Sequence, residues 1–109
     1  MKTKYNIIVT SQFKKSYKKI IKQGKDKNKL KNILIKLSND IPLDNKYKNH
    51  KLFDNKKYNN CYECHIEPDW LLIYQINSND LILLLIDTGS HSNLFKKWGI
   101  YERIWKWIV

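Results

Sequence analysis

Three strand-like runs in the second half of the chain constrain its fold more than any other feature. They are YNNCYECHI at 58–66, WLLIYQI at 70–76 and LILLLID at 81–87. The connections between them are too short for the crossovers that parallel strands need, so each neighbouring pair should form an antiparallel hairpin. The middle run is almost wholly apolar, which predicts a strand that is covered on both faces.

The first part of the chain predicts one strand and two helices. KYNIIV at 4–9 is typical of a short strand. Ser11 is placed to cap a helix over 12–23, and Asp26 is placed to cap a second helix that ends near Pro42. Apolar residues recur at helical spacing, at Phe13, Tyr17, Ile20 and Ile21 and again at Leu30, Ile33, Leu34 and Leu37. The order β-α-α-β-β-β predicts an α+β fold with two N-terminal helices packed on a mainly antiparallel sheet.

The remaining segments carry no strong periodicity. Residues 43–57 are polar and predicted to be irregular, and residues 89–95 are predicted to form a loop. No apolar run approaches the roughly 18 residues that a membrane span needs, and the first residues lack the apolar core of a signal peptide. We therefore expect a cytoplasmic protein that is not bound to a membrane.

Positive charge is concentrated in the first part of the chain. Residues 1–60 carry 17 lysines and four acidic residues, whereas residues 61–109 carry four basic and six acidic residues. The two net charges are therefore +13 and −2, in agreement with the formal charge of +11. Such a basic half favours nucleic acid, an anionic membrane or an acidic protein as partner. A compositional bias is the alternative, but it would enrich lysine throughout the chain.

The stretch CYECH at 61–65 has the C-x-x-C-H pattern of c-type haem attachment. Side chains alternate between the two faces of a strand, so Cys61, Glu63 and His65 should share one face and Cys64 should point to the other. Two cysteines that point apart cannot together bind one haem or one zinc ion. We therefore predict structural cysteines and no cofactor.

Three histidines and an aspartate are expected near one rim of the sheet. His65 ends the first hairpin strand, Asp69 lies in the turn after it, His91 follows the third strand, and His50 lies in the polar segment. Several imidazoles beside a carboxylate suit proton transfer near neutral pH, and they also suit metal binding. Three unrelated surface histidines are the simpler alternative.

Three segments closely resemble the YafQ branch of the RelE-type toxins of bacterial toxin–antitoxin pairs: IPLDNKYKNHKL, CHIEPDWLLIYQI and TGSHSNLF. The resemblance covers residues 41–95 in motif and residues 1–40 in architecture. It implies a RelE-like toxin domain over residues 1–95, followed by an extension at 96–109 that has no counterpart. The apolar side chains of this extension fall on one helical face, so we expect a helix that packs on the body or on a partner.

The resemblance implies a ribosome-dependent endoribonuclease that cuts mRNA in the ribosomal A site. In the metal-free reaction it implies, the ribose 2′-OH attacks the adjacent phosphorus and leaves a 2′,3′-cyclic phosphate and a 5′-OH. The residues that match catalytic positions of the family are His50, His65, Asp69 and His91. We expect His91 as the acid, His65 or Asp69 as the base, and His50 as a group that stabilises charge.

The same resemblance assigns further residues and partners. Trp70 and Phe95 are expected to support the site or to stack on a base, with core packing as the alternative. The implied partners are the ribosome, its mRNA and a DinJ-type antitoxin, with operator DNA bound only through the antitoxin complex. A nucleic-acid-binding module without catalysis is the rival interpretation, because basic helices and exposed aromatic residues would serve it equally well.

Asp87 departs from the family pattern, which has an arginine four residues before its last histidine. An arginine can hold the scissile phosphate with a fork of donors, whereas an aspartate repels it. Three hypotheses follow: another cation takes over, Asp87 instead orients His91, or the protein is a weak or inactive member that still binds RNA or its antitoxin. The candidate replacement cations are Lys51, Lys57, Lys96 and Arg103.

Overall fold

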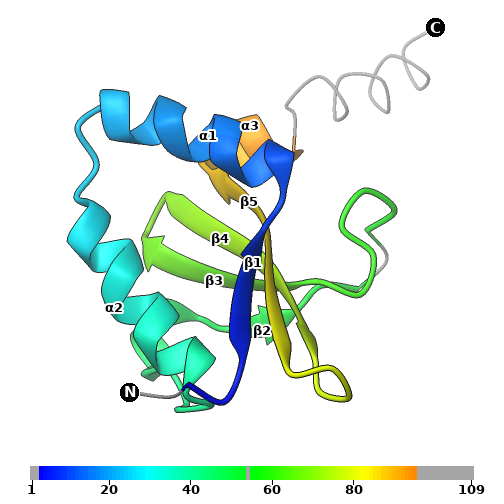
Figure 1. The fold of residues 1–109 in the computed structure, drawn as a ribbon. Coiled ribbons are helices and arrows are strands. Elements are labelled where there is room, and N and C mark those ends of the chain that lie inside the picture. The colour runs from blue at the N-terminus through cyan, green and yellow to red at the C-terminus, as the bar shows by residue number, and fades with distance from the viewer. Residues whose placement is uncertain (1–2, 54, 96–109) are drawn as a thin grey trace, which may run out of the picture.

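A computed structural model describes residues 3–53 and 55–95 of the protein (Figure 1). The elements are β1 (Asn6–Val9), α1 (Ser11–Lys22), α2 (Lys27–Ser38), the short 3-10 helix η1 (Asn45–Tyr47), β2 (His50–Lys51), β3 (Tyr62–Glu67), β4 (Trp70–Asn77), β5 (Ile82–Gly89) and α3 (His91–Phe95). The predicted α+β class and element order are confirmed, with η1, β2 and α3 as additions. The predictions for residues 96–109 lie outside the described residues.

The five strands form one sheet in the order β1-β5-β4-β3-β2. β3 pairs antiparallel with β4, and β4 pairs antiparallel with β5, which confirms the two predicted hairpins. β2 adds a further antiparallel pair with β3. β1 pairs with β5 in parallel, since the two helices carry the chain across the sheet after β1. Two register shifts interrupt the pairing, one between His65 and Glu67 and the other between Ile73 and Tyr74.

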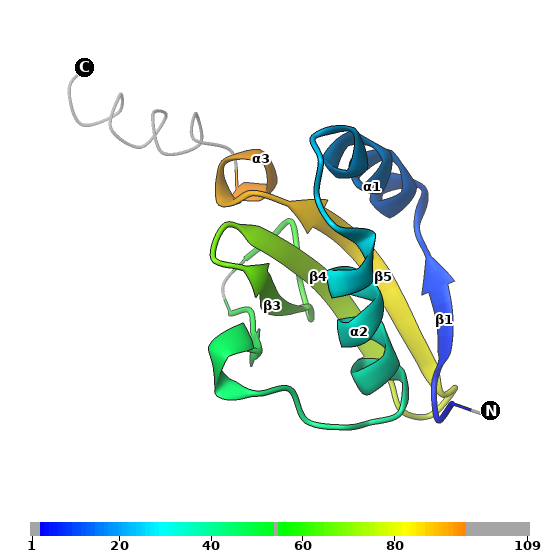
Figure 2. The same cartoon turned by 90° about the vertical axis from the view of Figure 1, so that its left-hand side faces the viewer.

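Both long helices cover one face of the sheet (Figure 2). Asp26 caps α2 as predicted, because its carboxylate accepts the Asn28 N–H at 2.9 Å. The prediction that Ser11 caps α1 is wrong, because the Thr10 hydroxyl oxygen accepts the Phe13 N–H at 3.0 Å. That hydroxyl also lies 3.0 Å from the Leu85 carbonyl oxygen of β5, so a contact with the sheet selects Thr10 as the cap.

β4 is buried on both faces, as its apolar run predicted. Trp70, Leu72 and Tyr74 pack beneath α1 and α2, in the core that also contains Cys64. Leu71 and Ile73 point the other way and form a second core with Tyr58, Cys61 and Leu94. The two cysteines are therefore unpaired and lie on opposite faces of the sheet, which confirms that they cannot share one ion or one haem.

Three boundaries differ from the sequence-based prediction. β3 begins at Tyr62 rather than at residue 58, because Tyr58 is drawn into the second core and its N–H is held by the Asn55 side chain. The segment 43–57 contains η1 and β2, and the predicted loop at 89–95 contains α3, whose Leu94 is buried. Of the helices within the described ranges, none is both long enough and apolar enough to cross a membrane.

Candidate active site

Strands β2 and β3 bring two histidines and a glutamate together. The antiparallel register places His50 of β2 opposite Glu63 of β3. His65 lies two residues further along β3, so its side chain is on the same face as that of Glu63. The sequence placed Glu63 and His65 on one face, and the pairing of β2 adds His50 to them.

The second half of the site comes from the ends of two other strands. His91 begins α3 directly after β5, and Asp69 lies in the turn between β3 and β4. The Asp69 carboxylate accepts the backbone N–H of His91 at 3.0 Å and lies 3.4 Å from Nδ1 of the same residue. The hydrogen bond from the His91 backbone holds the pKa of Asp69 below its ordinary value. Asp69 thus positions His91 through both its backbone and its ring.

Glu63 is the common centre of the three histidines. Nε2 of His50 lies 3.3 Å from Glu63 Oε2, and Nε2 of His65 and of His91 lie 3.5 and 3.7 Å from Glu63 Oε1. The carboxylate is buried, with its side chain 5% exposed, whereas the side chains of His50 and His91 are about half exposed at 51% and 52%. The site is therefore a buried carboxylate with two half-exposed imidazoles and the less exposed ring of His65, whose side chain is 15% exposed. We call Glu63, the three histidines and Asp69 the histidine cluster.

His65 and His50 share one ring orientation, with Nδ1 toward a backbone carbonyl oxygen and Nε2 toward Glu63. Nδ1 of His65 lies 3.2 Å from the Pro68 carbonyl oxygen, and Nδ1 of His50 lies 3.3 Å from the Lys51 carbonyl oxygen. A carbonyl only accepts, so these contacts favour the tautomers in which Nδ1 carries a proton. Nε2 of each ring then faces Glu63, where a second proton would make an ion pair.

Glu63 Oε1 has no hydrogen-bond partner among the described residues, although it is buried. A buried acceptor without a donor costs about 1–3 kcal/mol, and such a group in a native fold calls for an explanation. A proton on Nε2 of His65 or His91 would supply the missing partner. These two ring nitrogens lie 3.5 and 3.7 Å from Oε1.

The same groups could hold a metal ion. Ligand atoms of His50, Glu63 and His65 all lie within 4.8 Å of one another. Imidazole nitrogen and carboxylate oxygen are common ligands of zinc and copper. The expectation of metal-free chemistry therefore stays a prediction.

The two aromatic residues named from the sequence have different surroundings. The ring centroid of Phe95 lies 5.8 Å from that of His91, and Tyr58 packs edge-on against Phe95 at 5.7 Å. Trp70 is fully buried in the core, and its indole N–H donates to the Thr88 hydroxyl at 3.0 Å. Phe95 can thus steady His91 or meet a base, whereas the buried Trp70 ring supports the end of β5 and is not available to stack.

Asp87 is buried on β5 and serves as a structural link. Its carboxylate accepts hydrogen bonds from the Ser16 hydroxyl at 2.6 Å, the Tyr58 hydroxyl at 2.9 Å and the Thr88 N–H at 2.8 Å. These bonds link Asp87 of β5 to α1 and to the segment before β3. Within residues 3–53 and 55–95, no hydrogen bond joins this carboxylate to His91. The described residues therefore give no direct contact for the hypothesis that Asp87 orients His91. Tyr58, which donates to Asp87, packs against Phe95, whose ring lies beside that of His91.

The candidate replacement cations are only partly within the described residues. Lys51 is exposed on β2 beside His50. Lys57 donates to the Leu94 carbonyl oxygen at 3.3 Å and lines the same hollow as Asp87. Lys96 and Arg103 lie outside the described residues. Of the two candidates within the described residues, Lys51 is the one that follows a histidine of the cluster directly in the sequence.

Sequence reasoning missed the roles of two residues in this region, Glu63 and Tyr58. An acidic residue two positions before a strand histidine was the available signal for Glu63, because strand alternation puts both on one face. Tyr58 gave no comparable signal, since its contact with Asp87 joins positions 29 residues apart in the chain.

Two helices on one face of a mainly antiparallel five-stranded sheet, with histidines gathered where β2, β3 and α3 meet, define a RelE-like α+β protein. Residues 5–96 match the family described as bacterial toxin of type II toxin–antitoxin system, YafQ. The chain belongs to this YafQ toxin family.

Individual relatives agree with this assignment. The mRNA interferase toxin YafQ of Escherichia coli K12 is 37% identical over 91 residues, which cover 83% of this chain and 95% of the relative. A crystal structure of the E. coli DinJ–YafQ toxin–antitoxin complex matches with a TM-score of 0.74 at 36% identity, over 84% of this chain and 98% of the other. A metal-bound toxin from Helicobacter pylori matches with a TM-score of 0.78 at 37% identity, over 84% and 99% of the two chains.

Proposed function

We propose that this protein is an endoribonuclease that cuts mRNA in the ribosomal A site and so inhibits translation in the cytoplasm. The observation that carries the proposal is the convergence of three imidazole Nε2 atoms on the single buried carboxylate of Glu63, at 3.3 to 3.7 Å. Such a group of neighbours can take up one proton and release another near neutral pH. The names of the curated relatives and the basic first half of the chain support RNA as the substrate.

His91 is the proposed general acid. Its ring is half exposed, so it can reach a leaving group, and Asp69 anchors its backbone and Nδ1. In the reaction the 2′-oxygen bonds to phosphorus, the bond from phosphorus to the 5′-oxygen breaks, and Nε2 of His91 gives its proton to that oxygen. The products are a 2′,3′-cyclic phosphate and a 5′-OH.

The base is assigned to the pair formed by Glu63 and His65. Glu63 Oε1 is buried and has no donor, so the proton taken from the 2′-OH ends between this oxygen and Nε2 of His65. Asp69 was the other candidate for the base. It is less suited to this role, because its Oδ1 already accepts a hydrogen bond from the backbone N–H of His91. The role assigned to His50, whose ring is half exposed and 3.3 Å from Glu63, is to donate to the phosphorane.

The partner proposed for the inhibited state of the protein is a DinJ-like antitoxin. The solved complexes of E. coli YafQ with DinJ support this choice. An antitoxin with acidic segments would compete with RNA for the basic surface of the first half of the chain, which is a physical route to inhibition. Contact with operator DNA is proposed only for such a complex.

The test compares the wild-type protein with His91→Ala and Ser92→Ala on a defined mRNA carried by translating ribosomes. Ser92 is an exposed neighbour on the same helix and serves as the control for changes in α3. Mapping of new 5′ ends should give cuts with the wild type and Ser92→Ala, and none with His91→Ala. Absence of cuts from the wild type would overturn the endoribonuclease and favour a binding module, and persistent cuts with His91→Ala would overturn the assignment of the acid.

A further inference from the structure

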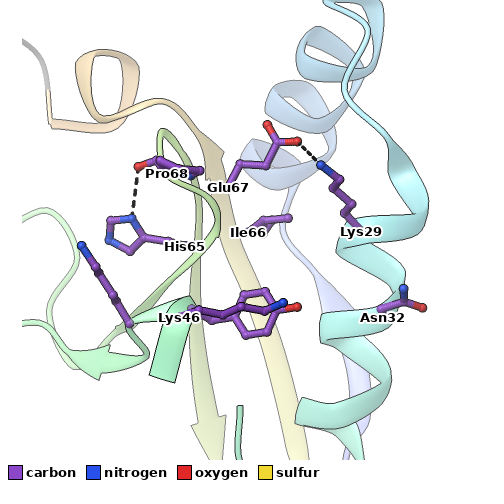
Figure 3. Close-up of a pocket in the computed structure, with 9 residues that line it drawn as sticks. Lys29, Asn32, Lys46, His65, Ile66, Glu67 and Pro68 are labelled. Carbon is purple, nitrogen blue, oxygen red and sulfur yellow. Dashed lines mark hydrogen bonds and ion pairs between the residues drawn. The ribbon is translucent and has the colours of Figure 1, made fainter. Parts of the chain in front are cut away.

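A hollow of about 500 Å³ opens beside the histidine cluster (Figure 3). Its walls come from three segments: α2 with Lys29 and Asn32, η1 with the residue that follows it, and the end of β3 with its turn. The volume falls within the range of about 300–1,000 Å³ that small-ligand pockets occupy.

His65 lines the hollow and also belongs to the histidine cluster. Its ring lines the hollow, its Nδ1 contacts the Pro68 carbonyl oxygen at 3.2 Å, and its Nε2 lies 3.5 Å from Glu63 Oε1. A group that occupied the hollow would therefore lie one side chain away from the reacting atoms. This separation by one side chain suits the nucleotide that is adjacent in the RNA chain to the nucleotide being cut.

The charges of the hollow are divided between two sides. The side formed by η1 carries Lys46 and Lys48, which are exposed and form no ion pair within the described ranges 3–53 and 55–95. On the opposite side, Glu67 accepts from Lys25 and Lys29, both at 2.7 Å. These hydrogen bonds hold the pKa of Glu67 below its ordinary value, so its charge is present at neutral pH. The lysines on this side are thus already paired with Glu67. Among the described residues that line the hollow, Lys46 and Lys48 of the η1 side therefore offer the positive charge that is not engaged by a carboxylate, and a phosphate is expected to bind there.

The remaining lining suits a base. Ile66 is buried and apolar, and Tyr47 is half-buried. Asn32 of α2 also lines the hollow and is exposed, with both an amide donor and an acceptor (Figure 3). Glu67 has further acceptor capacity beyond its two lysine partners, because a carboxylate offers about four lone-pair sites. An apolar surface with polar groups at its edge is how single-stranded bases are commonly recognised.

We propose that this hollow binds the nucleotide next to the scissile phosphate. Lys46 and Lys48 hold its phosphate, while its base lies over Ile66 with its edge toward Asn32 and Glu67. The acceptors favour a base that carries an exocyclic amino group over uracil. This assignment rests on the proposed endoribonuclease function, for which it names a substrate-binding site.

The test measures RNA binding without cleavage. The wild type is compared with the double variant Lys46→Gln/Lys48→Gln on a short oligoribonucleotide with 2′-O-methyl groups, which cannot undergo 2′-OH attack. The matched control is Lys14→Gln/Lys18→Gln, which makes the same change in net charge on exposed positions of α1. Melting curves confirm that all variants are folded.

We expect the η1 variant to lose on the order of tenfold or more in affinity, and to reduce the slope of log affinity against log salt by about 1–2. The α1 control should lose less than half as much on the logarithmic scale. Asn32→Ala should leave the salt slope unchanged and narrow the difference in affinity between amino-bearing bases and uracil, because base contacts carry specificity and phosphate contacts do not.

The outcomes separate the two proposals. Equal losses from the η1 variant and the α1 control would overturn the nucleotide site, whether or not the protein cuts RNA. A wild type that binds as predicted but gives no cuts on ribosomes would overturn the endoribonuclease and leave an RNA-binding hollow. A base preference that Asn32→Ala does not change would overturn the placement of the base.

Discussion

Replacing Glu63 with glutamine should slow RNA cleavage far more than it changes the stability of the fold. Glutamine keeps the shape of the side chain and removes the one charge that faces Nε2 of all three histidines. The carboxylate that is replaced is buried, and its Oε1 has no hydrogen-bond donor among the described residues. Because removal of such a group breaks no hydrogen bond at Oε1, we expect the free energy of unfolding to change by less than about 1 kcal/mol.

The size of the kinetic effect follows from the distances in the cluster. Two unit charges 3.5 Å apart interact by about 5 kcal/mol at an effective dielectric constant near 20. Solvent screens the half-exposed rings of His50 and His91, so we take about half of this as the loss when an imidazolium forms during the reaction. A loss of about 2–3 kcal/mol corresponds to a rate lower by roughly 30- to 150-fold.

The assay is single-turnover cleavage of a defined mRNA on ribosomes, with urea unfolding of the same samples. Asp80→Asn is the matched control, because it removes one negative charge in the turn at the far end of the β4–β5 hairpin. A rate for Glu63→Gln within twofold of the wild type would refute the reasoning. So would a loss of stability large enough to unfold the protein under the assay conditions.

Three further predictions follow from single contacts. Tyr58→Phe should lower the free energy of unfolding by about 1–3 kcal/mol, measured in urea, because it leaves the buried Asp87 without one of its donors. Lys29→Gln should raise the pKa of Glu67 toward its ordinary value of 4.5, measured by NMR titration of the carboxyl carbon. The ionised Glu67 stabilises the fold above pH 4.5, and this contribution is lost as the pH falls through its lowered pKa. Zinc added in slight excess should inhibit cleavage reversibly, because it would occupy nitrogens that exchange protons.

Each of these predictions has an outcome that contradicts it. An unchanged unfolding midpoint for Tyr58→Phe would mean that Asp87 finds another donor. An unchanged titration of Glu67 would mean that Lys25 alone sets its pKa. Stimulation of cleavage by zinc, or loss of activity in the presence of a chelator, would contradict metal-free chemistry.

The main features of the fold could be predicted because they depend on local pattern. The apolar run of β4 and the helical spacing in α1 and α2 each report burial within a few neighbouring residues. The choice between Thr10 and Ser11 as cap could not be predicted in this way, since both carry a hydroxyl. A carbonyl of β5, 75 residues away in the chain, selects Thr10.

The site was predictable only in part for the same reason. His65 and Asp69 lie on one hairpin, so the sequence could place them together. The contact of His50 with Glu63 depends on β2, a strand of two residues in a polar segment without periodicity. Asp87 follows a register shift in β5 that alternation along the strand does not reveal. Its burial and its bond to Tyr58 therefore appear only in the folded structure.

The most direct test of the account uses an mRNA in which one nucleotide at a mapped cut site carries a 2′-O-methyl group. The account predicts that the wild-type protein no longer cuts at this position but still cuts unmodified sites, where the products end in a 2′,3′-cyclic phosphate and a 5′-OH. Continued cleavage at the methylated nucleotide would contradict it, because the histidine cluster would then activate some nucleophile other than the neighbouring 2′-OH.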